Sequence, residues 1–115
     1  MTKLYNLEYL EEISGGDQDF INDMLNDFIT ITPGVISQIE SYISSQNWME
    51  LYKTLHKFIP SFEYVGGNDV KVELRNIENY AKTQTNTDQI PYLFQGVKGF
   101  CLDILEEIKT DFKIN

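Results

Sequence analysis

Hydrophobic residues recur along most of this chain at the three-then-four spacing of an amphipathic helix, and no segment shows the strict alternation of a half-buried strand. The pattern predicts an all-α protein. Its longest stretch runs from about Asp17 to Ile43, and the apolar phase continues across Pro33. Because a proline can bend a helix without ending it, this stretch is either one kinked helix or two nearly coaxial ones.

Glycine pairs and short polar segments divide the pattern into one short and four longer helices. The helices are expected over about residues 7–14, 17–43, 48–65, 70–81 and 88–112. Gly15 and Gly16 end the first of them, and Gly66 and Gly67 end the third. Short loops favour an antiparallel four-helix bundle with a short extra N-terminal helix, in a single domain over residues 1–115.

Charge and composition narrow the possible partners. The chain has 115 residues and a formal net charge of −9, which argues against nucleic acid and anionic membranes, because both bind basic surfaces. No apolar run is long enough to span a membrane and no secretory signal is visible, so a cytoplasmic monomer is expected. The single cysteine, Cys101, lies in an apolar stripe and is expected to be a packed thiol. With one histidine and no calcium-binding loop, no metal site is expected.

His56 is the only histidine and the best candidate for chemistry. It falls about 100° from Leu55 on the helical wheel, so it is expected outside the buried stripe and in contact with solvent. A neutral imidazole is a nucleophile near pH 7. A hydrolase is poorly supported, because no set of nucleophile, base and orienting acid can be assembled around one histidine.

The residues from Leu55 to Gly66 resemble the signature of histidine-containing phosphotransfer domains. There, an exposed histidine is followed by a lysine, a small residue or proline, a serine or threonine, and later a glycine. The order of helices is similar over essentially the whole chain, and Tyr64-Val65-Gly66 resembles the stand-alone form of the domain.

The resemblance implies that His56 takes a phosphoryl group from a receiver-domain aspartate and passes it to another receiver. The partners would be receiver domains of hybrid histidine kinases and response regulators. The chain would be a phosphocarrier rather than an enzyme, with no cofactor of its own, because the family's receiver partner supplies the magnesium.

Two positions after the histidine depart from the family pattern. The family usually has a lysine three residues after the histidine and a glycine next, where this chain has Ile59 and Pro60. Lys53 lies one turn before the histidine and is expected to substitute for the missing lysine, whereas Lys57 flanks the histidine. Ser61 stands where the family has its hydroxyl. Lys53, Lys57, Pro60 and Ser61 are therefore expected to support the phosphate around His56.

The long helix carries more apolar residues than one buried stripe needs. The expected core stripe contains Ile21, Met24, Phe28, Ile31, Val35, Ile39 and Tyr42, and a second apolar edge contains Leu25, Ile29, Ile36 and Ile43. Part of that second edge is expected to be exposed. Leu25 and Ile29 would then form, with Ile59, an apolar patch beside the histidine at which a receiver docks.

Two other functions fit the same pattern. A helical interaction module would use the amphipathic faces with His56 incidental, and a degenerate phosphotransfer fold would dock receivers without transfer. Ile59 in place of the lysine favours the second of these. The acid lability of any phosphate acquired from a phosphorylated receiver separates the three functions.

Overall fold

The chain is described here by a computed structural model over residues 4–112, and every regular element in that range is helical. The α-helices are α1 (Glu8–Ser14), α2 (Gln18–Ser44), α3 (Trp48–Phe58), α4 (Asn68–Thr83) and α5 (Ile90–Phe112). The 3₁₀ segment η1 (Ile59–Glu63) follows α3, and a second 3₁₀ segment, η2 (Thr87–Gln89), precedes α5. The all-α prediction is confirmed for this range, and α2 is one helix across Pro33. Within the same range, no helix has the length and apolar character needed to cross a membrane.

Local signals in the sequence set the ends of the helices. The Asp17 carboxylate caps α2 by accepting hydrogen bonds from two backbone amides of its first turn, at 3.0 and 3.3 Å. Asn47 caps α3 by accepting from the Glu50 amide at 3.4 Å. Gly15 has a left-handed φ of 64° at the end of α1, as the glycine pair predicted.

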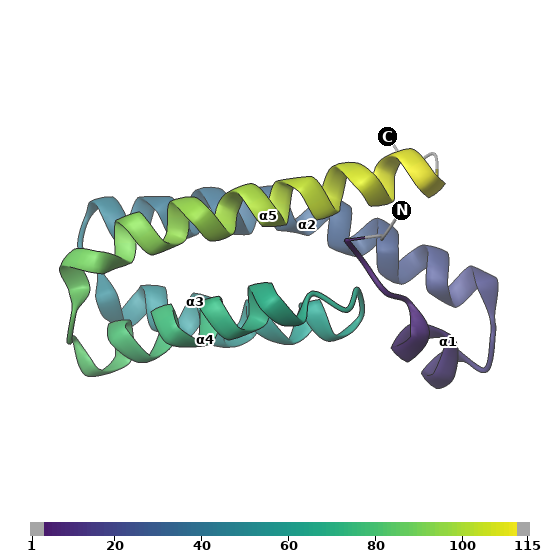
Figure 1. Ribbon diagram of the computed structural model, residues 1–115, viewed down its shortest axis with the longest axis horizontal. Helices are drawn as coiled ribbons and strands as arrows, with labels where there is room; N and C mark the ends of the chain where they lie inside the picture. Colours follow the sequence, from purple (N-terminus) through teal and green to yellow (C-terminus); the bar gives the residue numbers. More distant parts are fainter. Residues whose placement is uncertain (1–3, 113–115) are drawn as a thin grey trace.

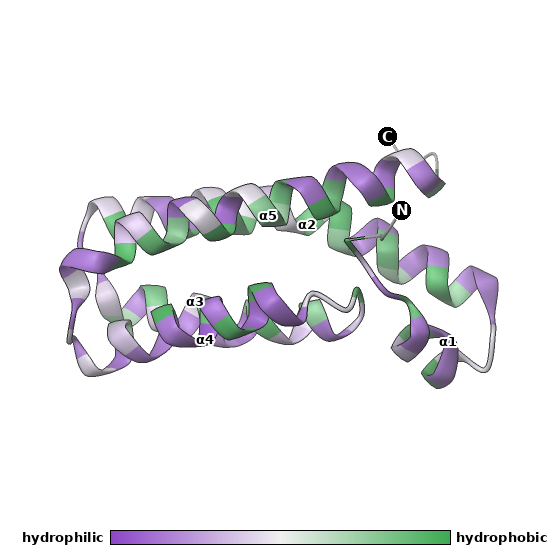
Figure 2. Cartoon of the chain, in the orientation of Figure 1, coloured by the Kyte–Doolittle hydropathy of each residue, from purple (hydrophilic) through white to green (hydrophobic). Residues whose placement is uncertain are grey.

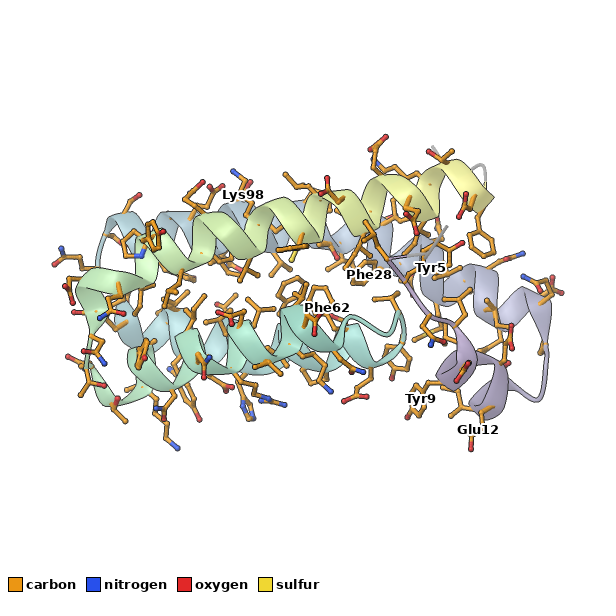
Figure 3. The ribbon with its side chains drawn as sticks, in the orientation of Figure 1. Tyr5, Tyr9, Glu12, Phe28, Phe62 and Lys98 are labelled. Carbon is orange, nitrogen blue, oxygen red and sulfur yellow. The ribbon has the colours of Figure 1, made fainter. Side chains whose placement is uncertain are left out.

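The four longer helices pack around a shared apolar interior. In Figure 1, α2 and α5 lie along one side of the molecule and α3 and α4 along the other, and contacts also join α2 to α3 and α4 to α5. Figure 2 shows hydrophobic positions of α2 and α5 on the edges that face α3 and α4. Phe28 of α2 meets Phe62 of η1 edge-on between the two pairs of helices, with ring centroids 5.4 Å apart (Figure 3).

The buried face of α2 is centred on the edge that was expected to be partly exposed. Its buried side chains are Ile21, Leu25, Phe28, Ile29, Thr32, Ile36 and Ile39. Met24, Val35 and Tyr42, which the sequence assigned to the core stripe, are only partly buried, and Ile31 is 59% exposed. The reason is that α2 contacts both α3 and α5, so the side chains between these two neighbours are the ones removed from water.

The helix that carries His56 is shorter than the sequence predicted, because α3 ends at Phe58 rather than near Val65. Pro60 has no N–H group with which to bond the carbonyl of His56 four residues earlier, and the chain tightens into the 3₁₀ turns of η1. Ile59, fully buried, continues the inward face of α3 across this change.

The N-terminal segment crosses one end of the helices and is held there by specific contacts. The Asn6 amide donates to the Val65 carbonyl at 2.8 Å. Gly66 has a φ of 70°, and a Cβ there would lie 2.6 Å from the Cβ of Asn6, so no larger residue fits without movement. The Tyr5 hydroxyl donates to Asp111 of α5 at 2.6 Å, and burial together with this hydrogen bond raises the pKa of Tyr5 to about 12.

Candidate functional site

His56 lies near the C-terminal end of α3, one position after the buried Leu55. Its side chain is 64% exposed, so the predicted exposure is confirmed. The inward face of the helix is formed by Leu51, Leu55 and Phe58, and a residue next to Leu55 is turned about 100° away from that face. The apolar spacing of α3 therefore puts the imidazole in solvent.

A buried carboxylate on α4 holds one nitrogen of the ring. His56 Nδ1 lies 2.8 Å from Glu78 Oε2, a contact that spans 22 positions in the sequence and depends on the packing of α3 against α4. Glu78 is only 7% exposed. Its other oxygen, Oε1, accepts a hydrogen bond from the Arg75 guanidinium at 3.0 Å. Both carboxylate oxygens therefore have partners, which offsets the cost of burying the charge.

This contact selects one tautomer of the histidine. An ionised carboxylate only accepts hydrogen bonds, so Nδ1 carries the proton and donates it to Glu78. In a neutral imidazole the reactive lone pair is then on Nε2. No group among residues 4–112 forms a hydrogen bond to Nε2 of His56. The site thus presents an oriented, solvent-facing nitrogen nucleophile.

Positive charge is concentrated around this nucleophile. Lys53 and Lys57 line the groove that contains His56, while Arg75 and Lys82 come from α4, and Lys53 and Arg75 are paired with Glu50 and Glu78. Lys82 of α4 places its Nζ 5.7 Å from the centre of the Tyr52 ring, and that ring lies 5.8 Å from the His56 ring. In a chain with a net charge of −9, such a cluster favours an anionic ligand at this place.

The two lysines of α3 differ in their partners. Both Lys53 and Lys57 line the groove that also contains His56. Lys53 Nζ pairs with Glu50 Oε1 at 3.4 Å, and the Lys53 side chain is 59% exposed. Exposed pairs of this kind contribute only ~0.2–1 kcal/mol, so an incoming anion competes easily for the ammonium group. Within the described residues Lys57 has no ion pair.

Ser61 and Pro60 lie just beyond the histidine, in η1. The Ser61 hydroxyl donates its hydrogen bond to the carbonyl of Phe58. This proton cannot be donated to a phosphate at the same time, although Ser61 lines the same groove as His56. Pro60 is exposed, and its visible effect is the change from α-helix to 3₁₀-helix.

A groove of about 660 Å³ runs beside the histidine between α2 and α3. The wall contributed by α2 contains Ile31, Val35, Gln38 and Tyr42. The wall contributed by α3 and η1 contains Glu50, Tyr52, Lys53, Thr54, His56, Lys57, Phe58 and Ser61. We call this surface the His56 groove. It combines an exposed isoleucine, Ile31, with a cationic rim.

The predicted docking patch of Leu25, Ile29 and Ile59 is wrong. Leu25 and Ile59 are fully buried and Ile29 is 5% exposed, so the three residues belong to the core. Ile59 follows Leu55 by four positions and continues the same inward face. The apolar surface beside the histidine comes instead from Ile31 and Val35, on the edge of α2 that the sequence assigned to the core.

Other reactive groups offer no competing site. Among residues 4–112, no group of three or more histidine, cysteine, aspartate or glutamate side chains is arranged to hold a metal ion. Cys101 is fully buried in α5, and burial raises the pKa of its thiol to about 12. The prediction of a packed thiol is confirmed, and Cys101 is not a candidate nucleophile.

Sequence reasoning missed Glu78 and Arg75, although one signal was present. Leu74, Glu78 and Ala81 follow the four-then-three spacing of a buried stripe, and Glu78 is the one charged residue in it. A charged residue on a buried face needs a partner. The sequence did not show that this partner is a histidine on another helix.

Comparison with known proteins adds no family to this picture. No protein-family model matches the chain, and no curated protein or solved structure matches it either.

Proposed function

We propose that the protein is a phosphorelay intermediate of the histidine-containing phosphotransfer type, with its four longer helices forming an antiparallel bundle. In this proposal His56 accepts a phosphoryl group from a receiver-domain aspartate and passes it to another receiver. The observation that carries the proposal is an exposed histidine whose Nδ1 is held by the buried Glu78. The protein would be a cytoplasmic phosphocarrier without catalytic activity of its own.

The chemistry needs little more than this arrangement. The Nε2 lone pair of His56 attacks the phosphorus of the aspartyl phosphate, an N–P bond forms, and the P–O bond to the aspartate breaks with its electrons leaving on the carboxylate. The proton on Nδ1 stays in place. The ring therefore gains positive charge, which the carboxylate of Glu78, 2.8 Å away, stabilises. The reverse sequence on a second receiver returns the imidazole to its neutral form.

The surroundings of His56 suit a receiver domain that carries a phosphorylated, acidic active site with a bound magnesium ion. Lys53 and Lys57 line the groove beside the nucleophile and can contact phosphoryl oxygens. The apolar Ile31 and Val35 provide area for docking on the α2 side of the His56 groove. Magnesium is expected on the receiver, and none is needed on this chain.

The test is transfer from receiver domains of the source organism, phosphorylated with phosphoramidate in the presence of magnesium. At least one receiver should give the protein an acid-labile, base-stable phosphate. His56→Gln should remove this label completely and preserve the helix content, because the residue is exposed and the glutamine amide can still donate a hydrogen bond to the buried Glu78. Full labelling of His56→Gln, or an acid-stable phosphate, would end the proposal.

Specific contacts favour a second candidate, a fold that docks receivers without transfer. The lysine expected three residues after the histidine is replaced by the buried Ile59, and the proton of the Ser61 hydroxyl is committed to a backbone carbonyl. The same experiment separates the two functions. Binding of a phosphorylated receiver with no phosphate on His56 would select docking alone.

A further inference from the structure

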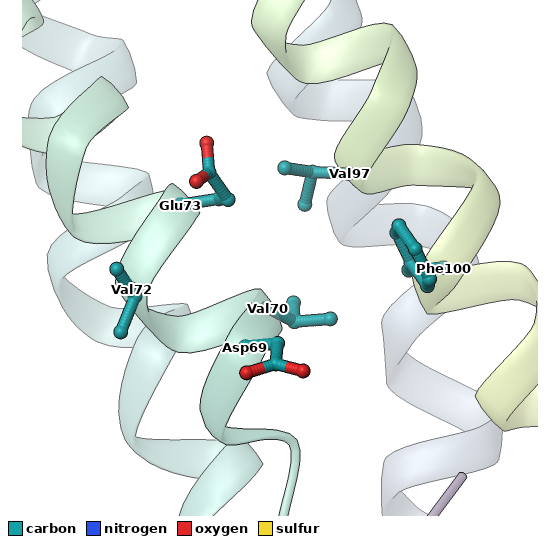
Figure 4. A pocket seen from close by; sticks show the side chains of 6 residues that line it. All are labelled: Asp69, Val70, Val72, Glu73, Val97 and Phe100. Atoms are coloured by element: carbon teal, nitrogen blue, oxygen red, sulfur yellow. The ribbon is translucent and has the colours of Figure 1, made fainter.

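A second groove lies between α4 and α5, away from the histidine. Figure 4 shows its centre, where Val70 of α4 faces Val97 and Phe100 of α5. Three adjoining hollows of about 270, 330 and 610 Å³ all include Phe100. Together they run from Leu4 at the N-terminal segment to Tyr92 near the start of α5. We call this surface the α4–α5 groove.

The α4–α5 groove exposes large apolar side chains. Phe100 and Val72 are each 60% exposed, and Tyr92 is 82% exposed. Apolar side chains of this size lose the favourable free energy of burial when they stay in water. Exposed apolar residues that are grouped mark an interaction site more often than scattered ones do. The groove also has room for a close partner, because nothing lies within 4 Å of a Cβ built on Gly96.

The rim of this groove is acidic. Asp69 and Glu73 of α4 line it beside the apolar floor (Figure 4). Neither carboxylate has an ion pair among the described residues. Two lysines carried by the same pair of helices are already engaged, since Lys71 pairs with Glu63 and Lys98 pairs with Glu40. An apolar floor beside unpaired negative charge is complementary to an apolar stripe flanked by positive charge.

The geometry points to the α4–α5 groove as a docking site for a basic amphipathic helix of a partner protein, with apolar side chains over Phe100 and Tyr92 and lysine or arginine against Asp69 and Glu73. A second copy of this chain fits less well, because a two-fold dimer would bring identical acidic rims together on subunits that each carry a charge of −9. A helix in a groove is a common mode of recognition.

This surface is separate from the site of the proposed transfer. Glu78 and Arg75, on one flank of α4, face His56, whereas Asp69 and Glu73 line the groove toward α5. A bound helix would therefore leave the His56 groove open. A partner could stay attached while receivers approach the histidine, which would raise the local concentration of one receiver if that partner carried it.

The test uses a blocked synthetic helical peptide with leucine at every third and fourth position and lysine on both flanks of that stripe. Titration into ¹⁵N-labelled protein should shift amide signals of α4 and α5 around Val70, Glu73 and Phe100. Phe100→Ser should weaken binding by roughly tenfold or more, since large central side chains dominate interfaces. Replacing Asp69 with Asn and Glu73 with Gln together should weaken it about fivefold and reduce its salt dependence.

Ile31→Ser is the matched control, because Ile31 is 59% exposed but lies in the His56 groove. This variant should leave peptide binding unchanged. A control peptide with glutamate in place of lysine should fail to bind. Signal shifts confined to the His56 groove, or no shifts up to millimolar peptide, would overturn the proposal. So would a dimer in sedimentation experiments that Phe100→Ser dissociates, because the occupant would then be a second copy. None of these readouts depends on phosphoryl transfer.

Discussion

The His56 groove and the α4–α5 groove both expose apolar side chains but differ in the charged residues that border them. Each exposes an apolar side chain to the same extent, Ile31 at 59% in the first and Phe100 at 60% in the second. The first is bordered by lysines and contains a histidine held by a buried carboxylate. The second is bordered by Asp69 and Glu73 and has no such nucleophile.

The difference shows what separates a site for chemistry from a surface for contact. In the proposed interactions apolar area would provide affinity in both grooves, but only in the first do fixed charges lie beside an accessible reactive atom. The buried partner, Glu78, matters more than the exposed residues, because it sets which nitrogen of the histidine is available.

The largest effect is expected on stability at Ile59, which the sequence wrongly placed in an exposed docking patch. Ile59→Asp would put a charge without a partner into the core, so we expect a loss of at least ~3 kcal/mol in the free energy of unfolding, or no folded protein. Ile31→Asp, at an exposed position, should cost under ~0.5 kcal/mol. Urea denaturation of both variants measures the difference. Equal, small losses would place Ile59 on the surface and restore the docking patch.

A second prediction concerns the carboxylate that orients the histidine. Glu78→Gln should slow phosphoryl transfer by roughly 10–100-fold, because a hydrogen bond to a charged group contributes ~1.5–3 kcal/mol. It should also shift the imidazole ¹⁵N signals toward the tautomer protonated on Nε2, which a purely structural role would not do. Peptide binding in the α4–α5 groove should not change. An unaltered tautomer with slowed transfer would show that Glu78 acts only through stability.

The smallest of the three effects is expected at Lys53, which was predicted to substitute for the lysine that the family usually has at the position of Ile59. Lys53→Ala should slow transfer about tenfold, at the low end for a charge contact, since this lysine is exposed and shared with Glu50. Lys57→Ala is the matched control on the same helix and should have a smaller effect. Single-turnover rates with one phosphorylated receiver decide the order. A larger effect of Lys57→Ala would assign the supporting role to that residue.

Much of the fold could be predicted because its signals are local. Gly15 and Asn47 act within a few residues of the helix ends that they mark, and the apolar spacing of α3 fixes the exposure of His56 without any knowledge of its neighbours. The sequence did not predict that α3 ends at Phe58, although Pro60 was visible. A proline can bend a helix or end it, and its position alone does not decide between the two.

The rest depended on which helices become neighbours. Two apolar edges of α2 satisfy the same period, and only its position between α3 and α5 decides that Leu25 and Ile29 are buried while Ile31 is exposed. The contact between His56 and Glu78 likewise exists only because α3 packs on α4. A periodic pattern in one segment contains no information about the residue that a different helix brings to it.

The most direct test of the account is the position of phosphorus on the histidine ring. The protein should be phosphorylated by a receiver domain and examined by ³¹P and ¹⁵N NMR without acid treatment. We expect an N–P bond at Nε2 of His56, with Nδ1 still protonated and hydrogen-bonded to Glu78. Phosphorus on Nδ1, on another residue, or on no residue after incubation with all receivers of the source organism would contradict it.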